Sequence, residues 1–408
     1  IKSRKRCYQL KFVLIQADGM PDRPLVELEG KTPLEAAKTP FMDQLVQSSE
    51  MGTINHIPKG MKSGSDVGNL SVLGYNPEKY FTGRSPIEAE SIGINLEPDD
   101  ICYRCNLVKI INKNGKEFMD DHSAGHIDTE ISRKIIGALK EKLEDAEFKL
   151  YQGVSYRHIV VWKGGQNNLE TTPPHDILEK NIIQYLPTGP GSVKLRDLMR
   201  QARIEIKKLK NLIPELKNSD CSDIWLWGQG KKPTLPHFKS IHKINGSVIS
   251  AVDLIKGIGK LSGLNVLEVD GATGYLDTNY KGKVDAALKS LKKGDFCMIH
   301  IEAPDETGHE GNYRKKIQAI TDLDKEVVGP IMEGLKREHN EYKICIVSDH
   351  PTPVDIRTHS YEYVPYMIFD SRLNKNNHNK DTFNERSANE SNIVHDDGHR
   401  LLGSFLKS

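Results

Sequence analysis

Short apolar runs that lead into acidic or turn residues recur at both ends of the chain and predict buried strands. The clearest of them span Leu10–Ala17, Phe296–Ile301 and Ile344–Ser348. Between the last two lies a segment from about Tyr313 to Arg337, whose apolar residues recur at helical spacing. Strand, helix and strand at such short spacing favour parallel βαβ units, so the pattern predicts an α/β fold built on a parallel sheet.

The middle of the chain has a different pattern. Lysine-rich helical segments, Ile131–Glu147 and Val193–Lys217, are mixed with short strand-like runs, Cys102–Ile111 and His158–Trp162. Because single hydrophobic cores stop growing at roughly 250–300 residues, a chain of 408 residues is expected to form more than one domain. The predicted division is a core formed by 1–98 and 245–408, with a smaller α+β domain inserted at 99–244.

Composition is that of an ordinary globular protein. Lys and Arg total 57 and Asp and Glu total 56, so charge does not point to nucleic acid or a membrane surface as partner. The basic residues 1–6 are not followed by the apolar stretch of a secretory signal, and no run reaches the ~20 apolar residues of a membrane span. We therefore predict a cytoplasmic protein. Its six cysteines, including the lone pair Cys102 and Cys105, are expected to be buried free thiols.

Candidate metal ligands follow the predicted strands. Ligands gather at the carboxyl ends of strands in an open parallel sheet, because the loops converge there. Three carboxylates and three imidazoles can reach this edge: Asp18, Asp305, His309, Asp349, His350 and His359. Such a set suits manganese, zinc or a similar first-row ion better than calcium. Two ions about 3.5–4 Å apart can stabilise the attacking and leaving oxygens of a phosphoryl transfer.

Ser65 is the candidate nucleophile. It lies in a glycine-flanked turn that leads into an apolar, helix-like run. A serine at a helix N-terminus lies beside free backbone N–H groups that favour a phosphate. A metal bound to its oxygen would help the hydroxyl to lose its proton.

Several motifs are distributed along nearly the whole chain. They are Ala17-Asp18-Gly19, Lys31–Pro40, Gly64-Ser-Asp-Val-Gly68, Leu73–Pro77, Gly271–Tyr275, Pro304-Asp-Glu-Thr-Gly-His309 and Val347-Ser-Asp-His350. Together they resemble the archaeal-type 2,3-bisphosphoglycerate-independent phosphoglycerate mutases of the alkaline-phosphatase superfamily. The resemblance implies an alkaline-phosphatase-like α/β core, with a mostly parallel sheet and helices on both faces, plus the inserted α+β domain. It also implies an isomerase of glycolysis and gluconeogenesis.

The resemblance further implies roles for individual residues. Asp18, Ser65, Asp349 and His350 would surround one divalent ion, and Asp305, His309 and His359 the other. The expected ion is Mn²⁺, with Zn²⁺, Co²⁺ and Mg²⁺ as alternatives, and no 2,3-bisphosphoglycerate is required. The phosphoryl group of 3-phosphoglycerate would move to Ser65 and return to the 2-hydroxyl.

Substrate-binding residues are expected in the inserted domain. Cationic or hydrogen-bonding side chains suited to a carboxylate and a phosphate are Arg104, His122, His126, Arg157, His175, Lys231 and Lys232. Asp176 is the predicted acid/base for the hydroxyl. Two features depart from the family pattern: Pro21 stands where a glycine is usual, and His122 and His126 where arginines are expected.

Other functions compete with this hypothesis. Another phosphomutase or a metal-dependent phosphatase could use the same ions, and a non-catalytic relative would be expected to have lost ligands. The stretch from His395 to His399 imitates the ligand motif, but it is predicted to cap a terminal helix. Monomer and homo-oligomer both remain open, and the expected partner is a small-molecule substrate.

Overall fold

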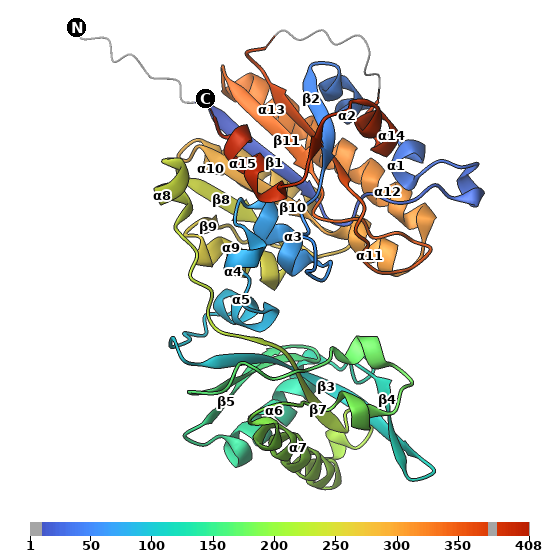
Figure 1. Cartoon of the computed structure of the whole chain (residues 1–408), viewed down its shortest axis with the longest axis vertical. Coiled ribbons are helices and arrows are strands. Elements are labelled where there is room, and N and C mark those ends of the chain that lie inside the picture. The colour runs from blue at the N-terminus through green and yellow to red at the C-terminus, as the bar shows by residue number, and fades with distance from the viewer. Residues whose placement is uncertain (1–9, 374–381, 408) are drawn as a thin grey trace, which may run out of the picture. The chain divides into compact units, whose positions relative to one another are not determined.

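The computed structural model describes residues 10–373 and 382–407, so residues 1–6 and Cys7 lie outside it. The chain forms two compact units, of which the second spans Thr82–Pro233 and the first comprises the rest (Figure 1). The second unit begins before residue 99 because helix α5 (Arg84–Ser91) packs on two of its strands. The limits of the second unit differ from those of the predicted inserted domain, 99–244. The role of this unit in binding substrate stays a prediction.

The first unit is built on an eight-stranded sheet in the order β13-β2-β12-β11-β1-β10-β8-β9. Its strands are β1 (Lys11–Ala17), β2 (Ser49–Ile54), β8 (Gly246–Ile249), β9 (Asn265–Val266), β10 (Phe296–Ile301), β11 (Tyr342–Val347), β12 (Val364–Asp370) and β13 (Val394–His395). Strand β1 pairs in parallel with β10 and β11, and only β12 runs antiparallel to its neighbours. Because the central strands are buried on both faces, they are nearly continuous apolar runs.

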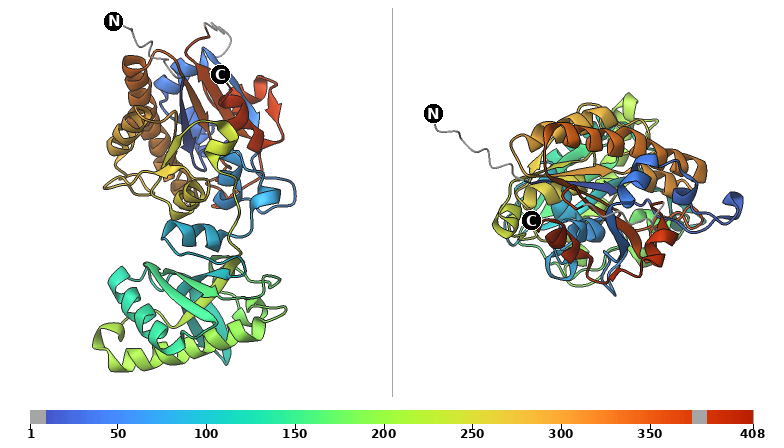
Figure 2. Two further views of the ribbon diagram at one scale, coloured as in Figure 1. Left: turned by 90° about the vertical axis from the view of Figure 1, so that its left-hand side faces the viewer. Right: turned by 90° about the horizontal axis from the view of Figure 1, so that it is seen from above.

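Helices cover both faces of this sheet (Figures 1 and 2). Val13 and Ile15 of β1 pack in the core with α2, α10, α12 and α13. Phe12 points the other way and packs its ring 5.5 Å from that of Phe405 in α15. The predicted α/β class is therefore confirmed. The helices are α1 (Pro33–Ala36), α2 (Pro40–Val46), α3 (Ser65–Val72), α4 (Pro77–Tyr80), α8 (Phe238–His242), α9 (Asp253–Leu261), α10 (Tyr280–Leu291), α11 (Ala303–His309), α12 (Tyr313–Leu323), α13 (Gly329–Glu338), α14 (Glu385–Glu390) and α15 (Leu401–Phe405).

The predicted helical segment from about Tyr313 to Arg337 is confirmed as α12 and α13, joined by a π-turn at Asp324–Val328 just before Pro330, which cannot donate a backbone hydrogen bond. One local prediction differs from the structure. Asp397 occupies the N-cap position of a 3₁₀ turn, but its side chain makes no capping hydrogen bond and pairs instead with Arg400 at 3.0 Å. The stretch from His395 to His399 therefore begins a helical turn without the predicted cap.

The second unit is an antiparallel sheet with two long helices. Its strands are β3 (Ile101–Lys113), β4 (Lys116–Asp121), β5 (Phe148–Val154), β6 (Arg157–Trp162) and β7 (Asp223–Gly230), and its helices besides α5 are α6 (Thr129–Leu143) and α7 (Ser192–Leu212). Cys102 and Cys105 are three residues apart on β3, so their side chains point to opposite faces of the sheet and lie in different packing clusters. Both are free thiols. Within the described ranges, no helix has the length and apolar character needed to cross a membrane.

Candidate active site

Three neighbouring strands bring the predicted carboxylates to one edge of the sheet in the first unit. Strand β1 lies between β10 and β11, and all three run in parallel. Asp18 follows β1, and its backbone N–H donates to Ile301 O at the end of β10 over 2.9 Å. Asp349 follows β11, and Asp305 lies in the first turn of α11, just after β10. All three side chains are buried.

Two histidines form a cluster with Asp305. His309 lies one helical turn later, with Nε2 3.2 Å from Asp305 Oδ2. His359, from the loop between β11 and β12, places Nε2 3.7 Å from Asp305 Oδ1 and 3.1 Å from His309 Nε2. Since Arg357 O can only accept a hydrogen bond, His309 Nδ1 donates to it over 3.0 Å, and Nε2 is the ring nitrogen that faces the cluster. One ligand atom from each of the three residues lies within 4.8 Å of the other two.

His350 forms a second cluster with the candidate nucleophile. Its Nε2 is 3.2 Å from Ser65 Oγ. The same nitrogen is 3.2 Å from Asp349 Oδ2 and 3.7 Å from Asp18 Oδ1. Ligand atoms of Asp18, Asp305 and His350 also lie within 4.8 Å of one another, so Asp305 belongs to both clusters. The structure thus brings the seven predicted side chains together.

Glycines allow the close approach of the segments at this edge. A Cβ at Gly68 of α3 would lie 2.8 Å from Asp349 Cβ. A Cβ at Gly19, where φ is +59°, would lie 2.5 Å from Asp305 Oδ1. Helix α3 begins at Ser65, so the N–H groups of its first turn lie beside the cluster.

The donor set fits divalent cations. Burial, together with the charges of Asp349 and Asp305, raises the pKa of Asp18 well above its ordinary value. Burial and the charge of Asp305 raise the pKa of Asp349 to about 6. Asp18 Oδ1 is buried and accepts no hydrogen bond from the described residues. Carboxylates this close repel one another, and imidazole and carboxylate oxygens together suit first-row divalent ions, whose charge relieves that repulsion.

Neighbouring residues orient these carboxylates. Asn69 Nδ2, from α3, donates to Asp349 Oδ2 over 2.9 Å. The backbone N–H of Gly19 donates to the other oxygen of Asp349 over 3.3 Å. The Thr352 hydroxyl donates to Asp305 Oδ1. Sequence reasoning missed Asn69 and Thr352, although both lie within four residues of a predicted site residue.

A buried ion pair joins two loops of the site. Lys316 of α12 is fully buried, and its ammonium group is 2.8 Å from Asp22 Oδ2. The same group donates to Pro21 O over 3.2 Å and to Thr352 O over 2.7 Å. Lys316 therefore ties the loop after β1 to the loop after β11, and Pro21 contributes through its carbonyl group.

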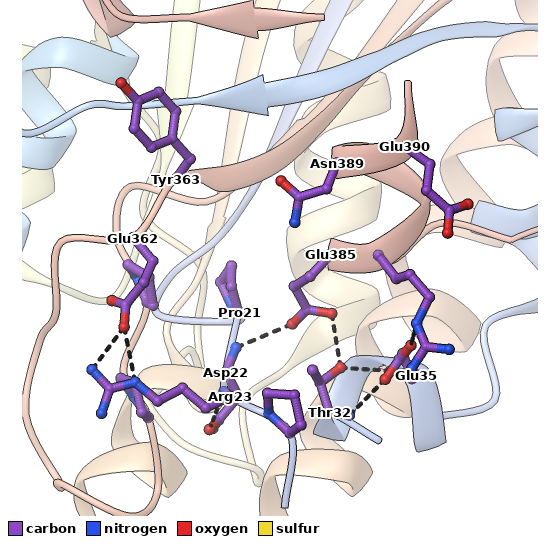
Figure 3. Close-up of a pocket in the computed structure, with 14 residues that line it drawn as sticks. Pro21, Asp22, Arg23, Thr32, Glu35, Glu362, Tyr363, Glu385, Asn389 and Glu390 are labelled. Carbon is purple, nitrogen blue, oxygen red and sulfur yellow. Dashed lines mark hydrogen bonds and ion pairs between the residues drawn. The ribbon is translucent and has the colours of Figure 1, made fainter. Parts of the chain in front are cut away.

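A pocket of about 420 Å³ lies beside these loops (Figure 3). Glu385 of α14 accepts the Asp22 backbone N–H over 3.1 Å and the Thr32 hydroxyl over 2.8 Å. Arg23 pairs with Glu362 at 2.7 Å on the opposite side. Because these polar groups satisfy one another, the lining of the pocket is part of the framework that holds the loops.

In the second unit, part of the predicted substrate set surrounds Trp227. The guanidinium group of Arg104, from β3, lies 4.5 Å from the centroid of the Trp227 ring. The His175 ring lies 5.3 Å from the same ring, with Nε2 3.7 Å from Asp176 Oδ1. Both His175 and Asp176 come from the short 3₁₀ helix Pro174–Ile177. Arg104 is buried, whereas His175 and Asp176 are exposed.

The other part of the set surrounds Tyr156. Arg157, His122 and His126 lie 5.4, 5.8 and 6.1 Å from the centroid of its ring. His122 is also 6.0 Å from His175, which connects the two parts. Partial burial lowers the pKa of His122. The His175 ring is desolvated where it packs against His122 and Trp227, although its other side is exposed, and this lowers its pKa to about 4. These two imidazoles are therefore neutral near pH 7 and offer hydrogen bonds instead of positive charge.

The two predicted lysines are already paired with carboxylates. Lys231 Nζ is 3.1 Å from Asp99, and Lys232 Nζ is 3.0 Å from Glu90. Both lysines follow β7 directly. Each of these ion pairs uses only part of the three-donor capacity of the ammonium group.

Sequence reasoning missed the partners of Arg104. Glu88 Oε2 accepts from Arg104 Nε at 3.1 Å, and Glu88 Oε1 pairs with Arg84 Nε at 2.7 Å. Burial acts to raise the pKa of Glu88, but the two arginines outweigh it and hold the pKa below its ordinary value. The i,i+4 spacing of Arg84 and Glu88, which both lie on α5, was the available signal.

The first unit has a mostly parallel sheet with helices on both faces. Carboxylates and imidazoles cluster at the carboxyl edge of this sheet. This combination is typical of the alkaline-phosphatase-like α/β proteins. Two family models match the chain: 2,3-bisphosphoglycerate-independent phosphoglycerate mutase over residues 47–211, and type I phosphodiesterase / nucleotide pyrophosphatase over residues 143–358. The chain belongs to the 2,3-bisphosphoglycerate-independent phosphoglycerate mutase family, since it is 42% identical to the enzyme of that name from Methanosarcina barkeri over 98% of this chain and all of the relative.

Other relatives agree with this assignment. The corresponding mutase of Methanothrix thermoacetophila is 42% identical over 96% of this chain and 98% of its own length. Among solved structures, the cofactor-independent phosphoglycerate mutase from Thermoplasma acidophilum shares the fold, with a TM-score of 0.64, 22% identity, and coverage of 97% of this chain and 99% of that one. The family and enzyme class predicted from the sequence, an isomerase, are confirmed.

Proposed function

We propose that this chain interconverts 3-phosphoglycerate and 2-phosphoglycerate, without 2,3-bisphosphoglycerate, by way of a phosphoserine at Ser65. The observation that carries the proposal is the meeting of Ser65 with six carboxylate and imidazole side chains at one sheet edge. The names of the relatives, which are phosphoglycerate mutases, support the choice of substrate.

Divalent ions are part of this proposal. One ion would be held by Asp18, Ser65, Asp349 and His350, and the other by Asp305, His309 and His359. When bound, the ions supply positive charge that stabilises the transferring phosphoryl group and the serine oxygen. The mixture of carboxylates and imidazoles favours Mn²⁺, with Zn²⁺, Co²⁺ and Mg²⁺ as alternatives.

Ser65 carries the phosphoryl group. Its Oγ forms a bond to phosphorus while the bond from phosphorus to the 3-oxygen of glycerate breaks. In the second half of the reaction, the 2-oxygen attacks phosphorus and Ser65 Oγ leaves. The backbone N–H groups of Ser65 and Asp66, at the start of α3, bind the phosphoryl oxygens in both steps, because those of Val67 and Gly68 already donate to Asp66 Oδ1 and Gly64 O.

The second unit holds the glycerate in the proposed mechanism. Arg104 and Arg157 bind the carboxylate, since a guanidinium group matches two oxygens at once. Asp176 moves the proton of the reacting hydroxyl. The remaining proposed contacts to the substrate come from His122, His126, His175, Lys231 and Lys232.

A cytoplasmic location is also proposed. The cysteines that the structure describes are all buried free thiols, as expected where thiols are kept reduced.

The product distribution tests the proposed activity. Protein loaded with Mn²⁺ and given 3-phosphoglycerate is expected to form 2-phosphoglycerate, with little free phosphate, as followed by ³¹P NMR. Added 2,3-bisphosphoglycerate should leave the rate unchanged. Free phosphate as the main product would instead identify a phosphatase.

A further inference from the structure

His300 is a buried histidine of β10 that contacts one of the candidate metal ligands. Its Nε2 lies 2.8 Å from Asp18 Oδ2, and its Nδ1 lies 3.0 Å from Ser250 Oγ. The three residues are at most 3% exposed. Strand register explains the contacts, because His300 pairs with Gln16, two residues before Asp18, and β8 ends one residue before Ser250 on the other side of β10.

The hydrogen bonds define where the proton of this ring lies. With a divalent ion bound, the Asp18 carboxylate is ionised and can only accept, so Nε2 carries the hydrogen that binds Asp18. The Val252 backbone N–H donates to Ser250 Oγ over 2.9 Å, which leaves the Ser250 hydroxyl hydrogen available for Nδ1. Each donor in the chain from Val252 through Ser250 and His300 to Asp18 then meets an acceptor.

The surroundings of the ring agree with a neutral imidazole. Lys283 of α10, itself buried, places its ammonium group 3.1 Å from His300 O, so a second positive charge is disfavoured here. His300 therefore acts as a fixed hydrogen-bond donor and not as a counter-ion for Asp18.

The contact affects only one oxygen of Asp18. Oδ2 is engaged by His300, whereas Oδ1 is buried, accepts no hydrogen bond from the described residues and lies 3.7 Å from His350 Nε2. A carboxylate free to rotate about its terminal bond would exchange these two oxygens. The hydrogen bond from His300 opposes that rotation.

We infer that His300 is a positioning residue: with Ser250 behind it, it holds the Asp18 carboxylate so that Oδ1 alone is presented to the divalent ion. The inference rests on the proposed metal site. Hydrogen-bond partners of metal ligands are worth about 10–100-fold in metal affinity. A histidine that served only to fill the core would change stability and leave metal affinity unchanged.

Metal titration of the metal-free full-length protein by calorimetry tests this inference. His300→Phe keeps a ring but removes both nitrogens, so the affinity for one ion is expected to fall about 10–100-fold. His300→Gln, whose Nε2 is as many bonds from the backbone as that of histidine, should recover most of the affinity. His158→Phe is the matched control, because His158 is a buried histidine of the second unit that accepts the Gly153 N–H over 3.0 Å.

A second readout does not depend on affinity. In protein loaded with Zn²⁺, which is diamagnetic and keeps Asp18 ionised, side-chain ¹⁵N shifts of His300 are expected to show the neutral ring with hydrogen on Nε2. Ser250→Ala removes the donor to Nδ1 and should mix the two tautomers. Hydrogen on Nδ1 in the unmodified protein would overturn the inference, and so would unchanged metal affinity in folded His300→Phe.

Asp18→Asn separates the inference from the proposed function. If Asp18→Asn lowers metal affinity but His300→Phe does not, the positioning role is wrong and the metal site stands. If neither substitution changes the affinity, the assignment of Asp18 as a ligand fails and the inference fails with it.

Discussion

The two units present their functional side chains in different ways. In the first unit, Asp18, Asp305 and Asp349 are buried, and each accepts a hydrogen bond from a neighbouring side chain. In the second unit, Arg157 and His175 of the proposed substrate set are exposed, and many contacts in the set are between rings. Metal ligands must lie within tenths of an ångström of their ideal positions, which requires this kind of support.

The comparison predicts that substitutions in the first unit abolish turnover, whereas those in the second mainly weaken substrate binding. Ser65→Ala has the largest expected effect, a loss of more than about 10³-fold in kcat, because it removes the atom that accepts the phosphoryl group. Metal binding should largely persist, since His350, Asp349 and Asp18 remain. Rates of 2-phosphoglycerate formation, together with a metal titration, check both parts. Normal activity would exclude the phosphoserine route.

Metal removal is the next test. Chelation should abolish activity and restoration of Mn²⁺ should recover it, because the clustered carboxylates need positive charge. Bound metal should also stabilise the fold, by about 2.7 kcal/mol at a free concentration of 100 Kd. Thermal unfolding with and without metal measures this effect. Activity that persists in fully metal-free protein would show that the clustered carboxylates of the first unit do not need a metal ion for turnover.

Arg104→Lys is expected to have an intermediate effect confined to the substrate. Loss of a hydrogen bond between charged groups costs about 1.5–3 kcal/mol, or about 10- to 100-fold in KM. The affinity for metal should not change, because Arg104 belongs to the second unit. Glu88→Gln should act in the same direction, since it removes the carboxylate that orients Arg104. Steady-state kinetics of both variants measure the change in KM. A change in metal affinity would contradict the assignment of metal binding to the first unit and substrate binding to the second.

Lys231→Ala and Lys232→Ala should have the smallest effects. Each ammonium group is partly exposed and paired with a carboxylate, and such pairs contribute about 0–1 kcal/mol. We expect KM to change less than in Arg104→Lys. An equal or greater effect in either variant would show that these lysines bind the substrate directly.

Local patterns in the sequence predicted a large part of this arrangement. The strands that lead into Asp18 and Asp349 could be predicted, because an apolar run followed by a turn indicates both the strand and the point where it ends. The π-turn at Asp324–Val328 could not be predicted, because the spacing of apolar residues on its two sides still resembles that of one helix.

The residues that support the site were harder to predict. His300 contacts Asp18 across 282 positions of sequence and Ser250 across 50, and only the strand register brings the three together. In the sequence, His300 is one residue in an apolar run, without a pattern that marks it. Glu88 was likewise missed, because its partner Arg104 belongs to a different element.

Two ions are proposed to lie in adjoining clusters that meet at Asp305. Titration of metal-free protein with Mn²⁺ tests this arrangement, by calorimetry for affinity and by electron paramagnetic resonance for coupling between neighbouring ions. Two ions per chain with coupled spectra are expected, together with a marked loss of affinity in Asp305→Asn. A single uncoupled ion, or binding that is unchanged in Asp305→Asn, would contradict this arrangement.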